Sequence, residues 1–244
     1  MSKLYVIPVE SACNASCPYC VNQFRNLGNS FLEISKLEKC LTEIGKLDAI
    51  EITGGGEPTL HPEIEKVIEF CADKTRTQMY SNGAILNSLS LDVLKRLNPL
   101  CISRAHYNFE KNEQIMGIKY SDEIFSKGLS IKLSTVLYKG GVDSPDEVIE
   151  YLGWAKGKAN KVVFRPLFED VNYSVDVKAK FVSLDSFAKY FCFNIKQGKN
   201  VHMNLDGMDV EFEVRSCSCE NTNPILHANG KLNYTWDSDD IDGK

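Results

Sequence analysis

The regular alternation of short apolar segments with amphipathic ones constrains the fold of this chain more than any other feature of its sequence. Six apolar segments rich in β-branched and aromatic residues are separated by segments with helical spacing. The predicted strands are residues 4–9, 49–53, 77–81, 100–104, 131–137 and 161–167. Strands that alternate with helices form a parallel sheet with right-handed crossovers. Six such units predict an α/β fold, either an open partial barrel or a doubly wound sheet.

The pattern changes after a predicted helix that ends near Gly198. Residues 201–205, 210–214 and 225–236 read as strands, and Asn229-Gly230 is a strong signal for a β-hairpin. We therefore expect two regions, an α/β domain over residues 1–199 and a short β-rich extension with an acidic tail over residues 200–244.

Composition excludes several classes of protein. With 244 residues, 43% hydrophobic and 25% charged, the chain is typical of a globular domain rather than a disordered one. A net charge of −5 argues against general nucleic-acid binding and against an anionic membrane surface. The sequence shows neither a targeting leader nor an apolar run long enough to span a membrane, so we expect a cytoplasmic protein with no membrane partner.

Five of the nine cysteines are clustered, and clustered cysteines are typical of metal sites. The other four, Cys40, Cys71, Cys101 and Cys192, stand singly in predicted elements and read as small buried hydrophobes. Directly after the first strand comes "ACNASCPYC", which holds Cys13, Cys17 and Cys20. Thiolates bind zinc or iron–sulfur clusters. Structural zinc needs four ligands, which here would require Cys217 and Cys219, whereas a [4Fe–4S] cluster held by three thiolates keeps one iron open.

A glycine-rich segment, "TGGGEPTLHP" (53–62), follows the second strand. Its glycines expose backbone groups to a ligand, and Glu57 adds a carboxylate. Taken alone, the segment reads as a flexible turn. The carboxyl ends of parallel strands share one edge of the sheet, however, so we expect this loop to lie beside the three thiols.

Together, "CNASCPYC" and "GGGEP" resemble the signature of the radical S-adenosylmethionine (radical SAM) superfamily over residues 4 to 170. The resemblance is to the branch that includes molybdopterin-precursor cyclases and the SPASM and Twitch maturases. It implies a partial (β/α)6 barrel with a short C-terminal β-rich extension. It also implies that Cys13, Cys17 and Cys20 bind a [4Fe–4S] cluster whose open iron chelates SAM.

The resemblance also assigns residues to SAM. Tyr19 would pack near the adenine, and Gly55, Gly56 and Glu57 would meet the methionine ammonium. Ser81 and Asn82 in "YSNG" would lie near the ribose and methionine. The later strands would contribute Ser103, Ser134 and, over the adenine, Leu167.

Three further residues keep two interpretations each. Arg104 and His106 after the fourth strand would hold a substrate anion or move a proton, or else form ordinary structural contacts. Arg165 would bind the SAM carboxylate or a substrate anion, or form a structural ion pair.

The C-terminal region resembles a SPASM or Twitch extension whose hairpin has lost its auxiliary cluster or never had one. Around "NGKLNYTWD" the family usually has a cysteine, which is absent here. Cys217 and Cys219 therefore read as two packed thiols, or else as donors of a hydrogen atom to a substrate radical.

The sequence thus predicts an enzyme that cleaves SAM reductively and uses the 5′-deoxyadenosyl radical to abstract hydrogen from a small molecule such as a nucleotide, sugar or amino acid. An electron donor such as flavodoxin or ferredoxin is the implied partner. The first alternative is a maturase that modifies a peptide or protein, and a remote one is a non-catalytic zinc-binding scaffold.

Overall fold

The structure is a computed structural model that describes residues 2–25, 27–167, 173–196, 198–205, 207–214 and 223–237. Its described strands form one sheet in the order β10-β9-β1-β2-β3-β4-β5-β6-β8-β7. The strands are β1 (Lys3–Val6), β2 (Ala49–Ile52), β3 (Thr77–Ser81), β4 (Leu97–Ser103), β5 (Ile131–Val136), β6 (Lys161–Arg165), β7 (Val201–Leu205), β8 (Met208–Phe212), β9 (Ile225–Leu226) and β10 (Leu232–Asn233).

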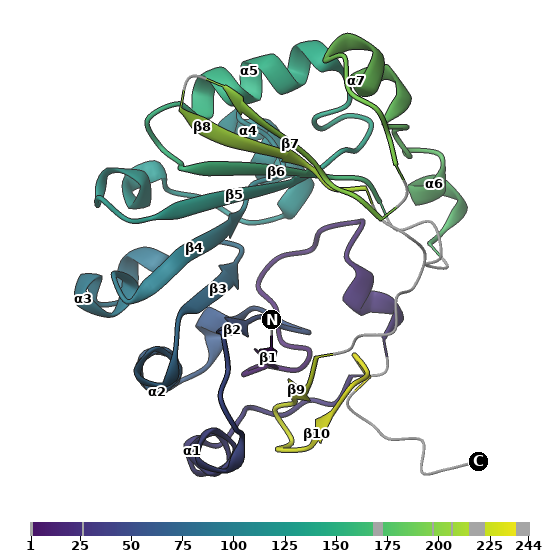
Figure 1. The fold of residues 1–244 in the computed structure, drawn as a ribbon. Coiled ribbons are helices and arrows are strands. Elements are labelled where there is room, and N and C mark those ends of the chain that lie inside the picture. The colour runs from purple at the N-terminus through teal and green to yellow at the C-terminus, as the bar shows by residue number, and fades with distance from the viewer. Residues whose placement is uncertain are drawn as a thin grey trace.

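Parallel pairing runs through the middle of the sheet, from β9 through β1 to β6 and on to β8. At the two edges, β7 pairs with β8 and β10 pairs with β9 in antiparallel fashion. Within the described chain no ladder joins β7 to β10, so the sheet stays open. Figure 1 shows the strands as an arc around the segment that follows β1. The predicted α/β fold with an open parallel barrel is confirmed.

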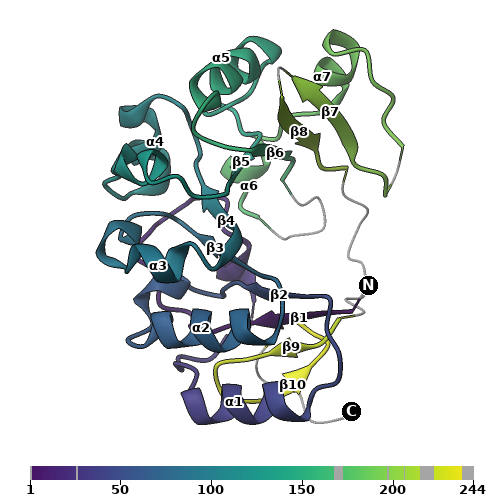
Figure 2. The same cartoon turned by 60° about the vertical axis from the view of Figure 1, so that its left-hand side comes forward.

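Helices follow most of the parallel strands and cover the convex side of the arc, as Figures 1 and 2 show for α1, α2, α3 and α5. The α-helices are α1 (Ile34–Glu43), α2 (Ile64–Lys74), α3 (Leu91–Leu94), α4 (Phe109–Met116), α5 (Pro145–Ala155), α6 (Val175–Lys178) and α7 (Asp185–Tyr190). Four short 3-10 helices are η1 (Val21–Phe24), η2 (Pro58–Leu60), η3 (Leu86–Ser88) and η4 (Asp122–Ser126). None of the described helices is long and apolar enough to cross a membrane.

The two faces of the sheet differ in chemistry because successive side chains of a strand point to opposite faces. One row, Ile52, Met79, Leu100 and Ile131 on neighbouring strands, is buried in the main core beneath the helices. The row beside it runs from Tyr80 through Cys101 and Lys132 to Lys161 and lies on the concave face. The sheet therefore packs its helices with an apolar face and turns a polar one inward.

The helix predicted to end near Gly198 is shorter than expected, since α7 ends at Tyr190. Cys192 adopts a φ of 56°, and the backbone N–H of Phe193 donates to the carbonyl of Ala188 over 3.0 Å. This is a Schellman-type helix end. It turns Phe191 and Phe193 onto Phe212, with ring centroids 5.7 and 5.1 Å from it. Aromatic packing therefore ends the helix early.

The strands after residue 200 extend the sheet at both edges rather than forming a further βα unit. The predicted hairpin at Asn229-Gly230 is confirmed, because β9 and β10 pair across this turn and Gly230 has a φ of 89°. Strand β9 pairs with β1, so residues 225–226 lie beside the first strand. The domain boundary between residues 199 and 200 stays a prediction.

Candidate active site

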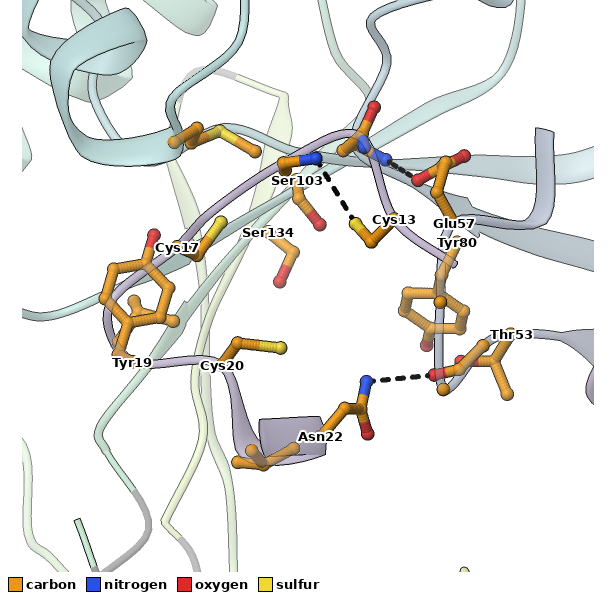
Figure 3. A pocket seen from close by; sticks show the side chains of 18 of the residues that line it. Cys13, Cys17, Tyr19, Cys20, Asn22, Thr53, Glu57, Tyr80, Ser103 and Ser134 are labelled. Atoms are coloured by element: carbon orange, nitrogen blue, oxygen red, sulfur yellow. Dashed lines mark hydrogen bonds between the residues drawn. The ribbon is translucent and has the colours of Figure 1, made fainter. Parts of the chain in front are cut away.

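The three thiols of Cys13, Cys17 and Cys20 lie on the loop between β1 and η1 and point into a common space on the concave side of the sheet (Figure 3). Two contacts with distant segments fix this loop. The backbone N–H of Ser16 donates to the carbonyl of Met116 over 2.8 Å, and the Asn82 side chain donates to Asn14 Oδ1 over 2.6 Å. The loop is thus held in shape by protein contacts alone.

Burial and the neighbouring thiols raise the pKa of Cys17 to about 12, and burial also raises the pKa of Cys13. Without a metal these thiols are therefore protonated at neutral pH, and a bound metal would displace the protons. In the described part of the chain, no group of three or more His, Cys, Asp or Glu side chains is placed to hold a metal ion. An iron–sulfur cluster is larger than a single ion and takes its thiolates at separate corners.

The glycine loop after β2 packs directly on the backbone of the thiol loop. The N–H of Gly56 donates to the carbonyl of Val9 over 3.0 Å, and that of Glu57 to Ala12 over 2.9 Å. A Cβ on Gly56 would lie 2.0 Å from the Ala12 oxygen, and one on Gly55 would lie 1.8 Å from the Glu10 oxygen. Only glycine allows this approach, so the two predicted motifs form one structural unit.

Glu57 is almost fully buried, and its carboxylate accepts four hydrogen bonds from neighbouring segments. Oε1 accepts from the Thr59 N–H at 3.1 Å, the Thr59 hydroxyl at 2.7 Å and the Ser81 hydroxyl at 2.7 Å. Oε2 accepts from the Asn82 N–H at 2.7 Å. Burial raises the pKa of Glu57, and the hydrogen bonds oppose that shift. The carboxylate therefore joins the loop after β2 to the end of β3.

A cavity of about 360 Å³ lies beside the three thiols and is large enough for a small cofactor. All residues predicted for the site line it. They are the thiols of Cys13, Cys17 and Cys20 together with Tyr19, Gly55, Gly56, Glu57, Ser81, Asn82, Ser103, Ser134 and Leu167. Figure 3 shows Ser103 and Ser134 on the wall between Cys17 and Cys13. The donor set, three thiols beside an open cavity, fits a cluster with one iron left for a non-protein ligand.

Aromatic side chains close one end of the cavity. Tyr19 is partly buried, and its ring centroid lies 5.2 Å from that of Tyr138. The hydroxyl of Tyr173 donates to the Tyr19 carbonyl over 3.3 Å, and Leu167 packs in the same cluster. This end is apolar, as the flat ring of a bound nucleoside would require.

The sequence analysis missed several residues of the cavity wall, namely Asn22, Arg25, Tyr80, Tyr173 and Trp236. Tyr80 follows the apolar residue Met79, which is buried in the main core, so strand alternation was a usable signal for its place on the concave face. No local signal marked Trp236, which reaches the cavity from the far end of the chain. Its ring lies 5.1 Å from that of Tyr5 and 4.8 Å from the Arg25 guanidinium.

Arg104 lines the cavity and His106 does not, and the side chains of both make structural contacts. The Arg104 guanidinium is fully buried, donates to the His106 carbonyl over 2.9 Å and lies 4.4 Å from the Tyr120 ring centroid. His106 Nε2 lies 3.1 Å from the Glu147 carboxylate, and burial lowers the His106 pKa. For these two residues the structural interpretation fits the geometry.

Arg165 lines the cavity and forms an ion pair with Glu213 at 2.9 Å. Cys217 and Cys219 lie outside the described residues, so their two interpretations stay open.

The amino-acid sequence of this chain is similar to those of known proteins. No protein-family model matches the chain. It is similar to the PqqA peptide cyclase of Methylobacterium nodulans, with 25% identity over an alignment of 197 residues that covers 68% of this chain and 51% of that protein. It is also similar to the GTP 3′,8-cyclase of Chlorobaculum tepidum, with 26% identity over 153 residues, 55% of this chain and 44% of that protein. The chain thus spans about half the length of these curated relatives.

Solved structures share the fold. Streptococcus suis SuiB bound to S-adenosylmethionine superposes with a TM-score of 0.65 at 15% identity, over 94% of this chain and 59% of that one. SuiB bound to its precursor peptide SuiA gives a TM-score of 0.62 at 15% identity over 94% and 58%. The anSMEcpe enzyme with bound AdoMet gives 0.59 at 16% identity over 98% and 76%.

Proposed function

We propose that this chain is a radical SAM enzyme and that it cleaves SAM to modify a peptide. The observation that carries the proposal is the placement of three thiols on one loop, facing a cavity that the glycine loop also lines. This is the donor set that leaves one iron of a [4Fe–4S] cluster open.

Cys13, Cys17 and Cys20 would hold the cluster. When bound, it supplies the electron that splits SAM into methionine and a 5′-deoxyadenosyl radical, which abstracts hydrogen from the substrate. The chain itself shapes the loop before any metal arrives, through the bonds from Ser16 and to Asn14. An external electron donor such as flavodoxin or ferredoxin remains part of the proposal.

The cavity wall would position SAM. Backbone groups of Gly55 and Gly56 line the cavity without side chains and would meet the methionine ammonium. Glu57 and Ser81 would act there mainly by fixing this loop, since the carboxylate already accepts four hydrogen bonds. Ser103 and Ser134 would contribute hydroxyls from neighbouring strands, in register with each other.

The apolar end of the cavity would hold the adenine. Tyr19 and Leu167 lie there, and the Tyr19 backbone is fixed by the hydrogen bond from Tyr173. Asn82, whose side chain reaches across to Asn14 on the thiol loop, would lie near the ribose and methionine.

A peptide substrate is better supported than the small molecule favoured by the sequence analysis. PqqA peptide cyclase is named for a peptide, and SuiB binds a precursor peptide. The sequence similarity to GTP 3′,8-cyclase supports a small-molecule substrate as the second candidate.

The test begins with anaerobic reconstitution and incubation with SAM and dithionite. Formation of 5′-deoxyadenosine supports radical SAM activity, and its absence from protein that has bound iron and SAM would contradict it. Peptides labelled with deuterium then separate the two substrate classes, because transfer of deuterium into 5′-deoxyadenosine identifies the hydrogen donor. Deuterium transfer from labelled GTP, with none from peptides, would favour the second candidate.

A further inference from the structure

Three side chains on the concave face of the sheet form a polar group beside the cavity. Lys132 on β5 donates from Nζ to the Tyr80 hydroxyl oxygen over 2.9 Å, and Nζ lies 4.7 Å from the Tyr80 ring centroid. The Arg165 guanidinium on β6 lies 5.7 Å from the same centroid. Tyr80 and Arg165 line the cavity, and Figure 3 shows the Tyr80 ring on its wall near Thr53.

The Tyr80 hydroxyl has a hydrogen to donate. Ammonium groups only donate hydrogen bonds, so Lys132 uses the oxygen of the phenol as an acceptor. Glu51 and Cys101 also face Tyr80. Among the described residues, however, neither receives a hydrogen bond from its O–H. Three donor groups thus converge where the described protein supplies no acceptor for the phenol hydrogen.

Among the described residues on this face of the sheet, three cations are paired with carboxylates and a fourth, Lys132, is not. Lys3 pairs with Glu51 at 2.7 Å, Arg165 pairs with Glu213 at 2.9 Å, and Lys161 pairs with Glu211. Lys132 has no carboxylate within ion-pair distance in the part of the chain that the structure describes. Its hydrogen-bond partner is the neutral Tyr80 phenol.

We propose that Lys132, Tyr80 and Arg165 bind one carboxylate of the substrate, the side chain of an acidic residue in a peptide. A single surplus cation matches a single negative charge better than it matches a polyphosphate. The guanidinium has five N–H groups, of which the Glu213 pair leaves some for a second oxyanion. The inference rests on the proposed function, since it names the group by which the same cavity recognises its peptide.

Two variants and two peptide pools test the proposal. Lys132→Met removes the surplus cation, and Lys161→Met is the matched control because Lys161 is the register partner of Lys132 on β6 but is paired with Glu211. The pools contain peptides of equal length, randomised except for a fixed central Glu in one and Gln in the other. Each is incubated with immobilised, iron-loaded protein and SAM without reductant, and the retained peptides are quantified by mass spectrometry.

The wild type and Lys161→Met are expected to retain the Glu pool about tenfold more than the Gln pool, as loss of a charge-assisted hydrogen bond would give. In Lys132→Met the ratio of retained Glu pool to retained Gln pool should fall close to one, while the iron content stays as in the wild type. Equal retention of the two pools by the wild type, or no retention of either, would overturn the inference. A preference for the Glu pool that survives in Lys132→Met would also overturn it. The same holds if the two pools bind equally and GTP competes with them in a way that depends on Lys132.

Turnover is measured separately with dithionite. A Glu preference in binding without any 5′-deoxyadenosine would defeat the proposed function and leave the carboxylate site standing. Formation of 5′-deoxyadenosine with no Glu preference would overturn the carboxylate site and leave the proposed function standing.

Discussion

Ser81 donates a hydrogen bond from its hydroxyl to Oε1 of Glu57 over 2.7 Å, and this bond joins the end of β3 to the loop after β2. The same hydroxyl oxygen accepts the backbone N–H of Gly83 over 3.0 Å. A carboxylate that the sequence suggests as a direct ligand of SAM is therefore also a junction between two loops of the site.

Replacement of Glu57 should lower stability as well as SAM affinity. Glu57→Ala leaves buried donors of Thr59 and Asn82 without their acceptor, which should lower the free energy of unfolding by about 3 kcal/mol. Ser81→Ala removes one of four donors and should cost about 1 kcal/mol. Urea unfolding of the metal-free proteins measures both. If Glu57→Ala unfolds like the wild type and loses only SAM affinity, then Glu57 acts as a ligand and not as a junction.

The glycine loop should not tolerate a side chain at position 56. The Cβ of Gly56→Ala would meet the Ala12 carbonyl at 2.0 Å, so the glycine loop and the thiol loop would have to separate. We expect reduced iron retention after reconstitution. Gly153→Ala is the control, because Gly153 lies within α5 with open space around it and should gain about 0.5–1 kcal/mol from higher helix propensity. Normal iron retention in Gly56→Ala would show that the contact is not needed.

Iron content should depend on the three clustered thiols alone. We expect about four irons and four sulfides per chain after anaerobic reconstitution, as one three-thiolate [4Fe–4S] site requires. The triple variant Cys13→Ala, Cys17→Ala, Cys20→Ala should bind no cluster, whereas Cys217→Ala with Cys219→Ala should keep full iron. About eight irons per chain, or iron lost from the second variant, would show a further cluster, and zinc without iron or sulfide would support the scaffold alternative.

Stability should fall on mild acidification through His61. Its Nε2 lies 2.7 Å from the Leu32 carbonyl and its Nδ1 accepts the Glu63 N–H over 3.1 Å, so the ring is neutral in the folded protein. Burial lowers the His61 pKa, and the unfolded chain therefore takes up a proton first, below about pH 6.5. Stability is lost as pH falls from about 7 toward the folded pKa and then levels off.

Comparison of urea unfolding at pH 7.5 and pH 5.5 tests this. His61→Gln should show a smaller difference between the two pH values than the wild type. His106, whose pKa is also lowered, contributes in the same direction and should keep part of the difference in the variant. An unchanged pH difference in His61→Gln would exclude its part in acid destabilisation.

The local sequence pattern was enough to predict most strands of the sheet and many of the residues that line the cavity. Parallel strands bring their carboxyl ends to one edge, so loops that follow successive strands meet without any knowledge of their contacts. For this reason Cys13, Gly55, Ser81 and Ser134 all line one cavity although they are far apart in the chain.

Contacts set by packing could not be predicted in this way. The early end of α7 depends on Phe191 and Phe193 reaching Phe212, which lies on a later strand. Trp236 reaches the cavity only because β9 pairs with β1. The burial of Glu57 between two loops was likewise hidden, because a carboxylate after three glycines looks the same whether it faces a ligand or another loop.

The pairing of β9 with β1 also affects how the chain is made on the ribosome. Strand β1 and the three cysteines emerge first, whereas the segment that covers the free edge of β1 emerges near the other end of the chain. Until then the nascent protein exposes an unpaired strand edge, and such edges pair with other chains. Chains interrupted before residue 225 should therefore accumulate as insoluble material, although every strand from β1 to β8 is already present.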